Sequence, residues 1–178
     1  MATSTTRLMT FAEFEQLADP QFGRYELRHG ELVTVAPPKY EHFMIQQILR
    51  DLLDKAAAGA GRAFTEVGFR ARPEFEYRIA DVAYAPKERW VPAKGQEYFL
   101  GAPELVIEVL SPSNTATEML DKRKICLENG SREFWVVDLD HQQVEVSTPD
   151  GRKVTYRAGQ QIPPFFVAQG LAVDAIFV

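Results

Sequence analysis

The sequence contains one cysteine, Cys126, in 178 residues, and only three histidines. A single cysteine excludes an intrachain disulfide and a zinc site built from several thiolates. The histidines, His29, His42 and His141, are scattered and show no paired spacing typical of zinc ligands. Because low cysteine content suits a reducing compartment, we expect a cytoplasmic protein.

Long hydrophobic runs and excess positive charge are also absent. No apolar run reaches the ~20 residues that a membrane-spanning helix needs, and residues 1–6 lack the apolar core of a signal peptide. The net charge of −5 argues against broad electrostatic binding of nucleic acid. Positive residues still gather in the middle third of the chain, as a local basic patch or a solvated face: Arg62, Arg70, Arg72, Arg78, Lys87, Arg89 and Lys94.

The chain is long enough for one domain with a substantial core. We expect a flexible tail over residues 1–8 and a single domain over 9–178. Helices are predicted from residue 11 to before 19, over 40–58 and over about 115–129. Strands are predicted at 24–27, 31–36, 62–72, 79–86, 105–110, 134–138, 143–147 and 153–157. Residues 86–103 read as a surface loop, and Ser111 and Ser113 as caps of the next helix.

This order of elements predicts a mixed α/β or α+β domain with a β-rich C-terminal part. Two acids lie alone in its apolar strands, Asp81 within residues 79–84 and Glu108 within 105–110. Removing an ionised carboxylate from water costs several kcal/mol unless something offsets it. Each acid is therefore neutral, paired with a cationic side chain, or bound to a metal ion.

Strand alternation places Asp81 on the face of Ile79 and Ala83, and Glu108 on the face of Val106 and Leu110. If the two strands are neighbours, the carboxylates can share one divalent cation, which offsets their repulsion. Mg²⁺ takes oxygen ligands and keeps several waters. Such waters are the usual nucleophile in phosphodiester hydrolysis.

A lysine near the acids would hold the phosphate or orient the water. Lys122, Arg123 and Lys124 are consecutive on the helix that follows. One stripe of that helix holds Met119, Lys122, Ile125 and Cys126, and another holds Ala116, Leu120, Arg123 and Leu127. Periodicity alone leaves open which stripe faces the sheet, or whether the three cations are simply solvated.

Four segments carry a resemblance to a known family. They are Tyr-Glu-Leu-Arg-His-Gly-Glu-Leu at 25–32, the strand of Asp81, Pro-Glu-Leu-Val-Ile-Glu-Val-Leu-Ser-Pro-Ser at 103–113, and Gly-Ser-Arg-Glu-Phe-Trp-Val-Val-Asp at 130–138. Together they resemble the Uma-type family of putative restriction endonucleases, in the PD-(D/E)xK nuclease superfamily. The resemblance extends from about Leu8 to the C-terminus. It implies a mixed central sheet flanked by helices, with a divalent-metal site at one sheet edge.

By position, the resemblance implies that Asp81 and Glu108 bind the metal, Mg²⁺ or Mn²⁺, with the main-chain carbonyl of Val109. Two departures stand out. Ala80 replaces the usual proline, and Leu110 stands where the superfamily's lysine would be. In the Uma-type pattern the lysine lies on the following helix, at Lys122, which we therefore expect to be catalytic together with Asp81 and Glu108.

Glu26 and His42 also match family positions. Glu26 is either a further acid near the metal or a partner in a hairpin salt bridge. His42 is either part of the site or a half-buried histidine with satisfied hydrogen bonds. Cys126 stands where the family often has tyrosine, so we interpret it as core packing.

The resemblance predicts a divalent-metal-dependent endonuclease-like phosphodiester hydrolase that acts on DNA, and a homodimer, because two-fold symmetry suits the cutting of both strands. The alternative is a catalytically inactive nuclease-like scaffold that binds nucleic acid or a protein. Hydrolysis of another phosphate ester is a third reading.

Overall fold

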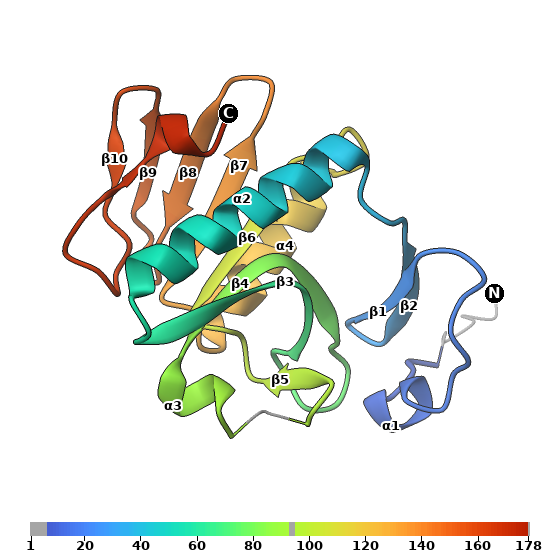
Figure 1. The fold of residues 1–178 in the computed structure, drawn as a ribbon. Coiled ribbons are helices and arrows are strands. Elements are labelled where there is room, and N and C mark those ends of the chain that lie inside the picture. Colours follow the sequence, from blue (N-terminus) through green and yellow to red (C-terminus); the bar gives the residue numbers. More distant parts are fainter. Residues whose placement is uncertain (1–6, 93–94, 178) are drawn as a thin grey trace.

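A seven-stranded mixed sheet forms the centre of the protein (Figure 1). The computed structural model describes residues 7–92 and 95–177, so most of the predicted N-terminal tail lies outside the described residues. In spatial order the strands are β5 (Tyr98–Leu100), β3 (Gly61–Arg70), β4 (Arg78–Pro86), β6 (Leu105–Val109), β7 (Glu133–Asp138), β8 (Gln143–Ser147) and β9 (Lys153–Arg157). The pairs β3–β5 and β6–β7 are parallel and the others antiparallel. The predicted mixed sheet is confirmed.

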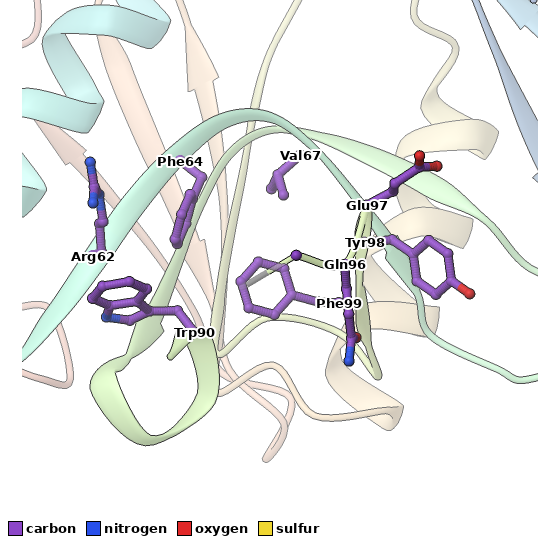
Figure 2. A pocket seen from close by; sticks show the side chains of 9 residues that line it. Arg62, Phe64, Val67, Trp90, Gln96, Glu97, Tyr98 and Phe99 are labelled. Atoms are coloured by element: carbon purple, nitrogen blue, oxygen red, sulfur yellow. The ribbon is translucent and has the colours of Figure 1, made fainter. Parts of the chain in front are cut away.

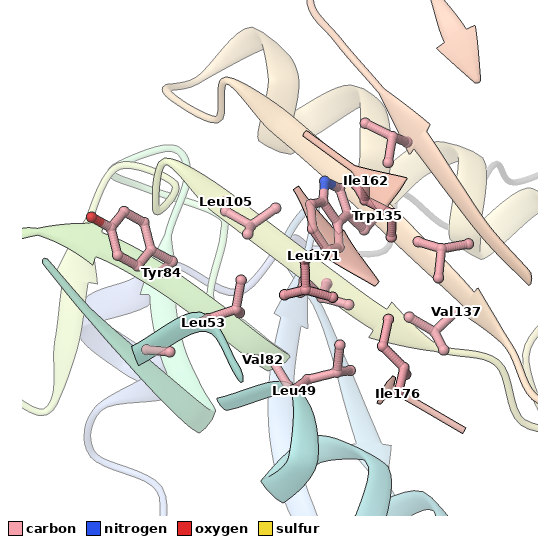
Figure 3. Packing of buried hydrophobic residues seen from close by; sticks show 14 of the residues in the cluster. Leu49, Leu53, Val82, Tyr84, Leu105, Trp135, Val137, Ile162, Leu171 and Ile176 are labelled. Atoms are coloured by element: carbon pink, nitrogen blue, oxygen red, sulfur yellow. The ribbon is translucent and has the colours of Figure 1, made fainter. Parts of the chain in front are cut away.

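Two long helices cover opposite faces of this sheet. Helix α2 (Tyr40–Ala57) lies on one face and α4 (Ala116–Glu128) on the other. In α2 the buried apolar residues recur every four positions, at Ile45, Leu49, Leu53 and Ala57, which aligns them along one stripe. Figure 3 shows Leu49 and Leu53 packed toward the sheet. Each fully buried leucine contributes roughly 1.5–3 kcal/mol.

Short elements complete the described chain. They are α1 (Phe11–Phe14), the hairpin of β1 (Arg24–Arg28) and β2 (Glu31–Val35), α3 (Lys87–Trp90), the pair β10 (Gln161–Ile162) and β11 (Leu171–Ala172), and the 3₁₀ turn η1 (Val173–Ala175). The predicted capping box of Thr10 and Glu13 is present in α1. Within the described ranges, no helix has the length and apolarity to cross a bilayer.

Two local predictions were wrong. The region 86–103 is not simply a loop, because it contains α3 and β5, and β5 joins the edge of the sheet beside β3. The cap of α4 is Thr115, whose side chain accepts from the N–H of Glu118 in a capping box. Ser111 instead bonds to Ser113 and Asn114, so these two serines shape the preceding turn.

The hairpin β1–β2 is held against the main sheet by a network of ion pairs. Arg78 on β4 is buried, with Nε 2.8 Å from Glu76 Oε2 and Nη2 2.8 Å from Asp121 Oδ2. His29 in the hairpin turn contacts the same two acids, Glu76 and Asp121, each at 2.7 Å. Because Asp121 belongs to α4, the network joins hairpin, sheet and helix.

The side-chain alternation of β4 breaks at Asp81. Ala80 and Ala83 belong to the apolar cluster on the α4 side, whereas Val82 and Tyr84 belong to the cluster on the α2 side. A regular strand would place Ala80 and Val82 on the same face. The prediction that Asp81 shares a face with Ala83 was therefore wrong.

Strand β3 is irregular at the facing position. Thr65 and Val67 pair with Val82 and Ala80, but Glu66 between them is left out of the ladder. Its φ is +52°, in the left-handed region that residues other than glycine rarely adopt. The two strands thus depart from regular geometry together, beside the two predicted site residues Asp81 and Glu108.

Candidate active site

The ladder between β4 and β6 ends next to the two predicted acids. The last pair is Val82 with Ile107, so Asp81 and Glu108 follow directly beyond it. The N–H of Asp81 donates to Glu108 Oε1 at 3.4 Å, and the N–H of Val109 donates to Asp81 Oδ2 at 2.7 Å. Where the ladder stops, carboxylate oxygens accept from main-chain N–H groups in place of main-chain carbonyls. These bonds bring the two carboxylates together.

Lys122 approaches the acids from α4. Its Nζ lies 2.7 Å from Glu108 Oε2 and donates to the main-chain oxygen of Ile79 at 2.6 Å. The stripe of α4 that is buried is the one with Met119 and Lys122. Lys122 itself is only 8% exposed. Since an ammonium group has three N–H bonds, one remains after these two contacts.

The other two cations of α4 point elsewhere. Arg123 Nη1 lies 2.7 Å from Glu145 Oε1 on β8, and Lys124 is largely exposed. The three consecutive cations therefore have three different environments, and only Lys122 contacts the site acids.

Glu26, on β1, forms the wall next to Lys122. It is buried, with Oε2 2.7 Å from Arg28 Nε and Oε1 2.7 Å from the N–H of Ile79. Its Oε1 is also 3.9 Å from Lys122 Nζ. Glu26 therefore makes the salt bridge within the hairpin that one interpretation predicted. It also lies near Lys122 and the site acids, as the other interpretation predicted.

His42, in the first turns of α2, lies beside Asp81. Its Nε2 is 3.1 Å from Asp81 Oδ2, within ion-pair distance. Burial disfavours the charged imidazole, but the carboxylates of Asp81, Glu66 and Glu108 outweigh it and raise the pKa of His42. The neighbouring carboxylates therefore favour the protonated form of His42.

Two residues of this neighbourhood were missed by sequence reasoning. Gln46 on α2 is fully buried, and its Nε2 donates to Asp81 Oδ1 at 3.1 Å and to Glu66 Oε1. The signal for Gln46 was present, because it is in helical phase with Leu49 and Leu53 on the apolar stripe. Glu66 is also a lone acid in its strand, but that strand is less apolar than the strands of Asp81 and Glu108. The pattern of a single acid in an apolar run therefore does not single it out.

Burial dominates the protonation of Glu108. It raises the pKa of Glu108 to about 8, with Asp81 adding to the effect and Lys122 opposing it. Burial also disfavours the charge on Lys122, but the Glu108, Glu26 and Asp81 carboxylates outweigh it and raise the pKa of the ammonium. Lys122 therefore keeps its positive charge, and the Glu108 carboxyl holds a proton more tightly than a solvated carboxyl does.

All of the residues predicted for the site line one cleft of about 500 Å³: Asp81, Glu108, Val109, Lys122, Glu26 and His42. The cleft lies between the hairpin, the start of α2 and the turn after β6. Arg24, Arg28 and Lys39 supply cationic groups at its wall. The fold therefore gathers residues of β1, α2, β4, β6 and α4 around one opening.

A second hollow, of about 310 Å³, lies between β3, β5 and α3 (Figure 2). Phe64 packs edge-on against Trp90 and Phe99, and the Arg62 guanidinium lies 5.6 Å from the centre of the Trp90 ring. This hollow contains none of the predicted site residues. The acidic cleft is therefore the better candidate for chemistry.

Asp81 and Glu108 are carboxylates that the cleft offers to a metal ion. In the part of the chain that the structure describes, no group of three or more His, Cys, Asp or Glu side chains is arranged to hold a metal ion. Asp81 and Glu108 supply two carboxylates, and Mg²⁺ is commonly bound by one or two carboxylates with waters in the remaining positions. The residues therefore fit a hard divalent cation such as Mg²⁺ or Mn²⁺.

Comparison with known proteins places the chain in a family. The fold is similar to that in the crystal structure of a putative nuclease belonging to DUF820 from Anabaena variabilis ATCC 29413. The TM-score is 0.81 and the sequence identity 22%, over 95% of this chain and 97% of that chain. No curated protein matches the sequence. The family Uma2, described as a putative restriction endonuclease, matches residues 11–174, and the chain belongs to this family.

Proposed function

We propose that the protein is a divalent-metal-dependent endonuclease that hydrolyses phosphodiester bonds in DNA. The observation that carries the proposal is the end of the β4–β6 ladder, where Asp81 and Glu108 come together with Lys122 beside them. Two carboxylates and an ammonium group around one cleft suit an anionic substrate and a cation. Membership of a family described as nucleases supports this proposal.

The roles of the residues follow from their contacts. Asp81, Glu108 and the carbonyl of Val109 would hold Mg²⁺ or Mn²⁺, which when bound polarises a phosphate oxygen and an attacking water. Lys122, held by Glu108 and the Ile79 carbonyl, would direct its remaining N–H toward the phosphate or the water. Glu26 contributes negative charge behind Lys122 and keeps its side chain in place.

Cationic side chains at the cleft wall would meet the DNA backbone. Arg24 is half exposed, while Arg28 is paired with Glu26 and Glu118. Because the chain is acidic overall, this local positive charge would set where a polyanion can approach. We also propose a homodimer, which light scattering coupled to gel filtration would test, and a cytoplasmic location.

A nicking assay on supercoiled DNA tests the proposal. Cleavage should require Mg²⁺ or Mn²⁺, stop with EDTA, and be lost in Asp81→Asn and in Glu108→Gln. Lys124→Met, an exposed neighbour of Lys122 on α4, is the matched control and should cut like the native chain. Tight DNA binding without cleavage would instead support the scaffold alternative, and inhibition by another phosphate ester would indicate a different substrate.

Crystals soaked in Mn²⁺ give an independent test of the site. A peak within about 2.0–2.3 Å of oxygens from both Asp81 and Glu108 is expected. A peak that touches neither acid would contradict the assignment of the metal ligands.

A further inference from the structure

The amide of Gln46 has an unusual environment. The side chain is fully buried behind the cleft wall, and its single nitrogen donates to the carboxylates of both Asp81 and Glu66. Its Oε1 has no hydrogen-bond partner among the described residues. Leaving a buried acceptor unsatisfied destabilises the folded state. A purely structural position on the apolar stripe of α2 would be filled more favourably by an apolar residue.

The charges around Gln46 dictate how its amide is oriented. An amide has two N–H donors on one end and an acceptor on the other. With the nitrogen toward Asp81 and Glu66, each carboxylate receives one N–H. The reverse orientation would bring Oε1 against two acidic groups, so electrostatics keeps the donors directed at Asp81.

Asp81 is thereby held from two sides. Oδ1 accepts from Gln46 at 3.1 Å, and Oδ2 accepts from the N–H of Val109 at 2.7 Å. These two bonds fix the plane of the carboxylate, and each oxygen keeps a second lone pair. The side chain is 20% exposed and lines the cleft. Oδ2 also lies 3.1 Å from His42 Nε2.

Glu66 anchors this arrangement. It receives the second N–H of Gln46, and Arg24 of the hairpin holds it through contacts to its carboxylate at 3.4 Å and its main-chain oxygen at 2.9 Å. Glu66 has a left-handed φ, which is strained for a residue other than glycine, and its side chain contacts Gln46 of α2. Strain of this kind persists only when the surrounding contacts hold it, as they do here.

We propose that Gln46 is a positioning residue for Asp81, with Glu66 as its anchor. Gln46 fixes the orientation of the Asp81 carboxylate without touching the cation or the substrate. The effect on metal binding rests on the proposed function, whereas the effect on Asp81 itself does not. Groups that orient a metal ligand typically contribute 10–100-fold in metal affinity.

The first experiment needs no metal. In the full-length chain with EDTA, hydrogen exchange at the Val109 amide reports whether Asp81 stays in place, because Asp81 Oδ2 is its acceptor. Gln46→Met keeps the size of the side chain and removes both donors, and should speed this exchange about tenfold or more. The matched control is Gln47→Met, the next residue of α2, which should leave it unchanged.

The second experiment measures Mn²⁺ affinity by calorimetry. Gln46→Met should weaken binding by about 10–100-fold, while Gln47→Met binds like the native chain. Glu66→Gln, which keeps an acceptor for the Gln46 N–H, should retain affinity, and Glu66→Met should lose it. Glu66→Met also carries the test if Gln46→Met does not fold.

The outcomes separate the two proposals. If the native chain binds no Mn²⁺, the proposed metal site fails, and exchange at Val109 alone still decides the role of Gln46. Unchanged exchange in folded Gln46→Met would overturn the positioning role. So would a loss of Mn²⁺ binding in Glu66→Gln as large as in Asp81→Asn, because Glu66 would then be a ligand itself.

Discussion

Lys122 Nζ lies 2.7 Å from Glu108 Oε2, and this buried ion pair joins helix α4 to strand β6. At about pH 9, where the Glu108 carboxyl is ionised, Lys122→Met should lower the free energy of unfolding by about 3–5 kcal/mol, because it leaves Glu108 without its charged partner. The double variant Lys122→Met/Glu108→Gln should be more stable than Lys122→Met alone. Urea unfolding in EDTA measures the stability of Lys122→Met, of Glu108→Gln and of the double variant.

Lys124→Met is the control for that series. Lys124 is exposed and lies 4.0 Å from Glu128, so its loss should change stability by no more than about 0.5 kcal/mol. If the changes in unfolding free energy caused by the Lys122 and Glu108 substitutions simply add in the double variant, the two side chains do not stabilise each other, which would contradict the prediction.

A pH dependence follows from Glu108. Burial raises the pKa of its carboxyl from 4.5 to about 8, so the folded chain binds a proton more tightly than the unfolded chain does. The contribution of Glu108 to stability therefore falls as pH rises from about 4.5 to 8. Glu108→Gln lacks this titration. Its thermal midpoint relative to the native chain should rise across that window, as scanning calorimetry in EDTA would show.

Divalent cations should counteract this loss of stability at higher pH in the native chain. A cation that binds the Glu108 carboxylate competes with the proton, so Mn²⁺ should raise the thermal midpoint more at pH 8 than at pH 6. A pH-independent shift would mean that Glu108 is not the titrating ligand. Asp81→Asn, with one ligand fewer, should show a smaller shift at both values.

Several residues of the candidate site can be predicted from the sequence, because they stand out against the periodicity of the strand or helix that carries them. Asp81 and Glu108 stand out as lone acids in apolar strands, and Lys122 shares a helical stripe with Met119, which the structure shows to be the buried one. Which stripe faces the sheet depends on packing, so periodicity left that open and only the family pattern favoured Lys122.

The remaining features depend on contacts between distant segments. The irregularity at Glu66 arises where β3 and β4 depart from regular geometry together, which no local pattern encodes. Strand β5 has three residues and exists because it pairs with β3. Gln46 could have been found, since a polar residue in phase with Leu49 and Leu53 is unusual, but its partners could not.

Cys126 should be chemically inert in the folded chain. Its side chain is fully buried, and burial raises the pKa of the thiol, so little reactive thiolate forms. Iodoacetamide should leave Cys126 unmodified in the native protein and alkylate it in urea, as intact-mass spectrometry would show. Cys126→Ala should keep metal-dependent cleavage. Rapid labelling of the native chain, or loss of cleavage in a folded Cys126→Ala variant, would contradict a packing role.

Arg78 should determine whether the hairpin stays docked. Its guanidinium is buried between Glu76 and Asp121, and His29 of the hairpin turn contacts the same two acids. Arg78→Met removes the central cation and should cost about 3–5 kcal/mol, because two acids lose their partner in a low-dielectric region. The His29 amide, which donates to Glu76 Oε1 at 3.0 Å, should then exchange faster with solvent.

The matched control for Arg78 is Arg72→Met. Arg72 is about half exposed and its pairing with Glu128 at 3.3 Å is worth at most about 1 kcal/mol. Exchange at His29 should therefore be unchanged in Arg72→Met. Because β1 of the same hairpin carries Glu26 and Arg24 to the cleft, a loosened hairpin should also weaken Mn²⁺ binding in Arg78→Met. Equal exchange at His29 in the two variants would show that the hairpin is held by its main-chain contacts and not by the buried arginine.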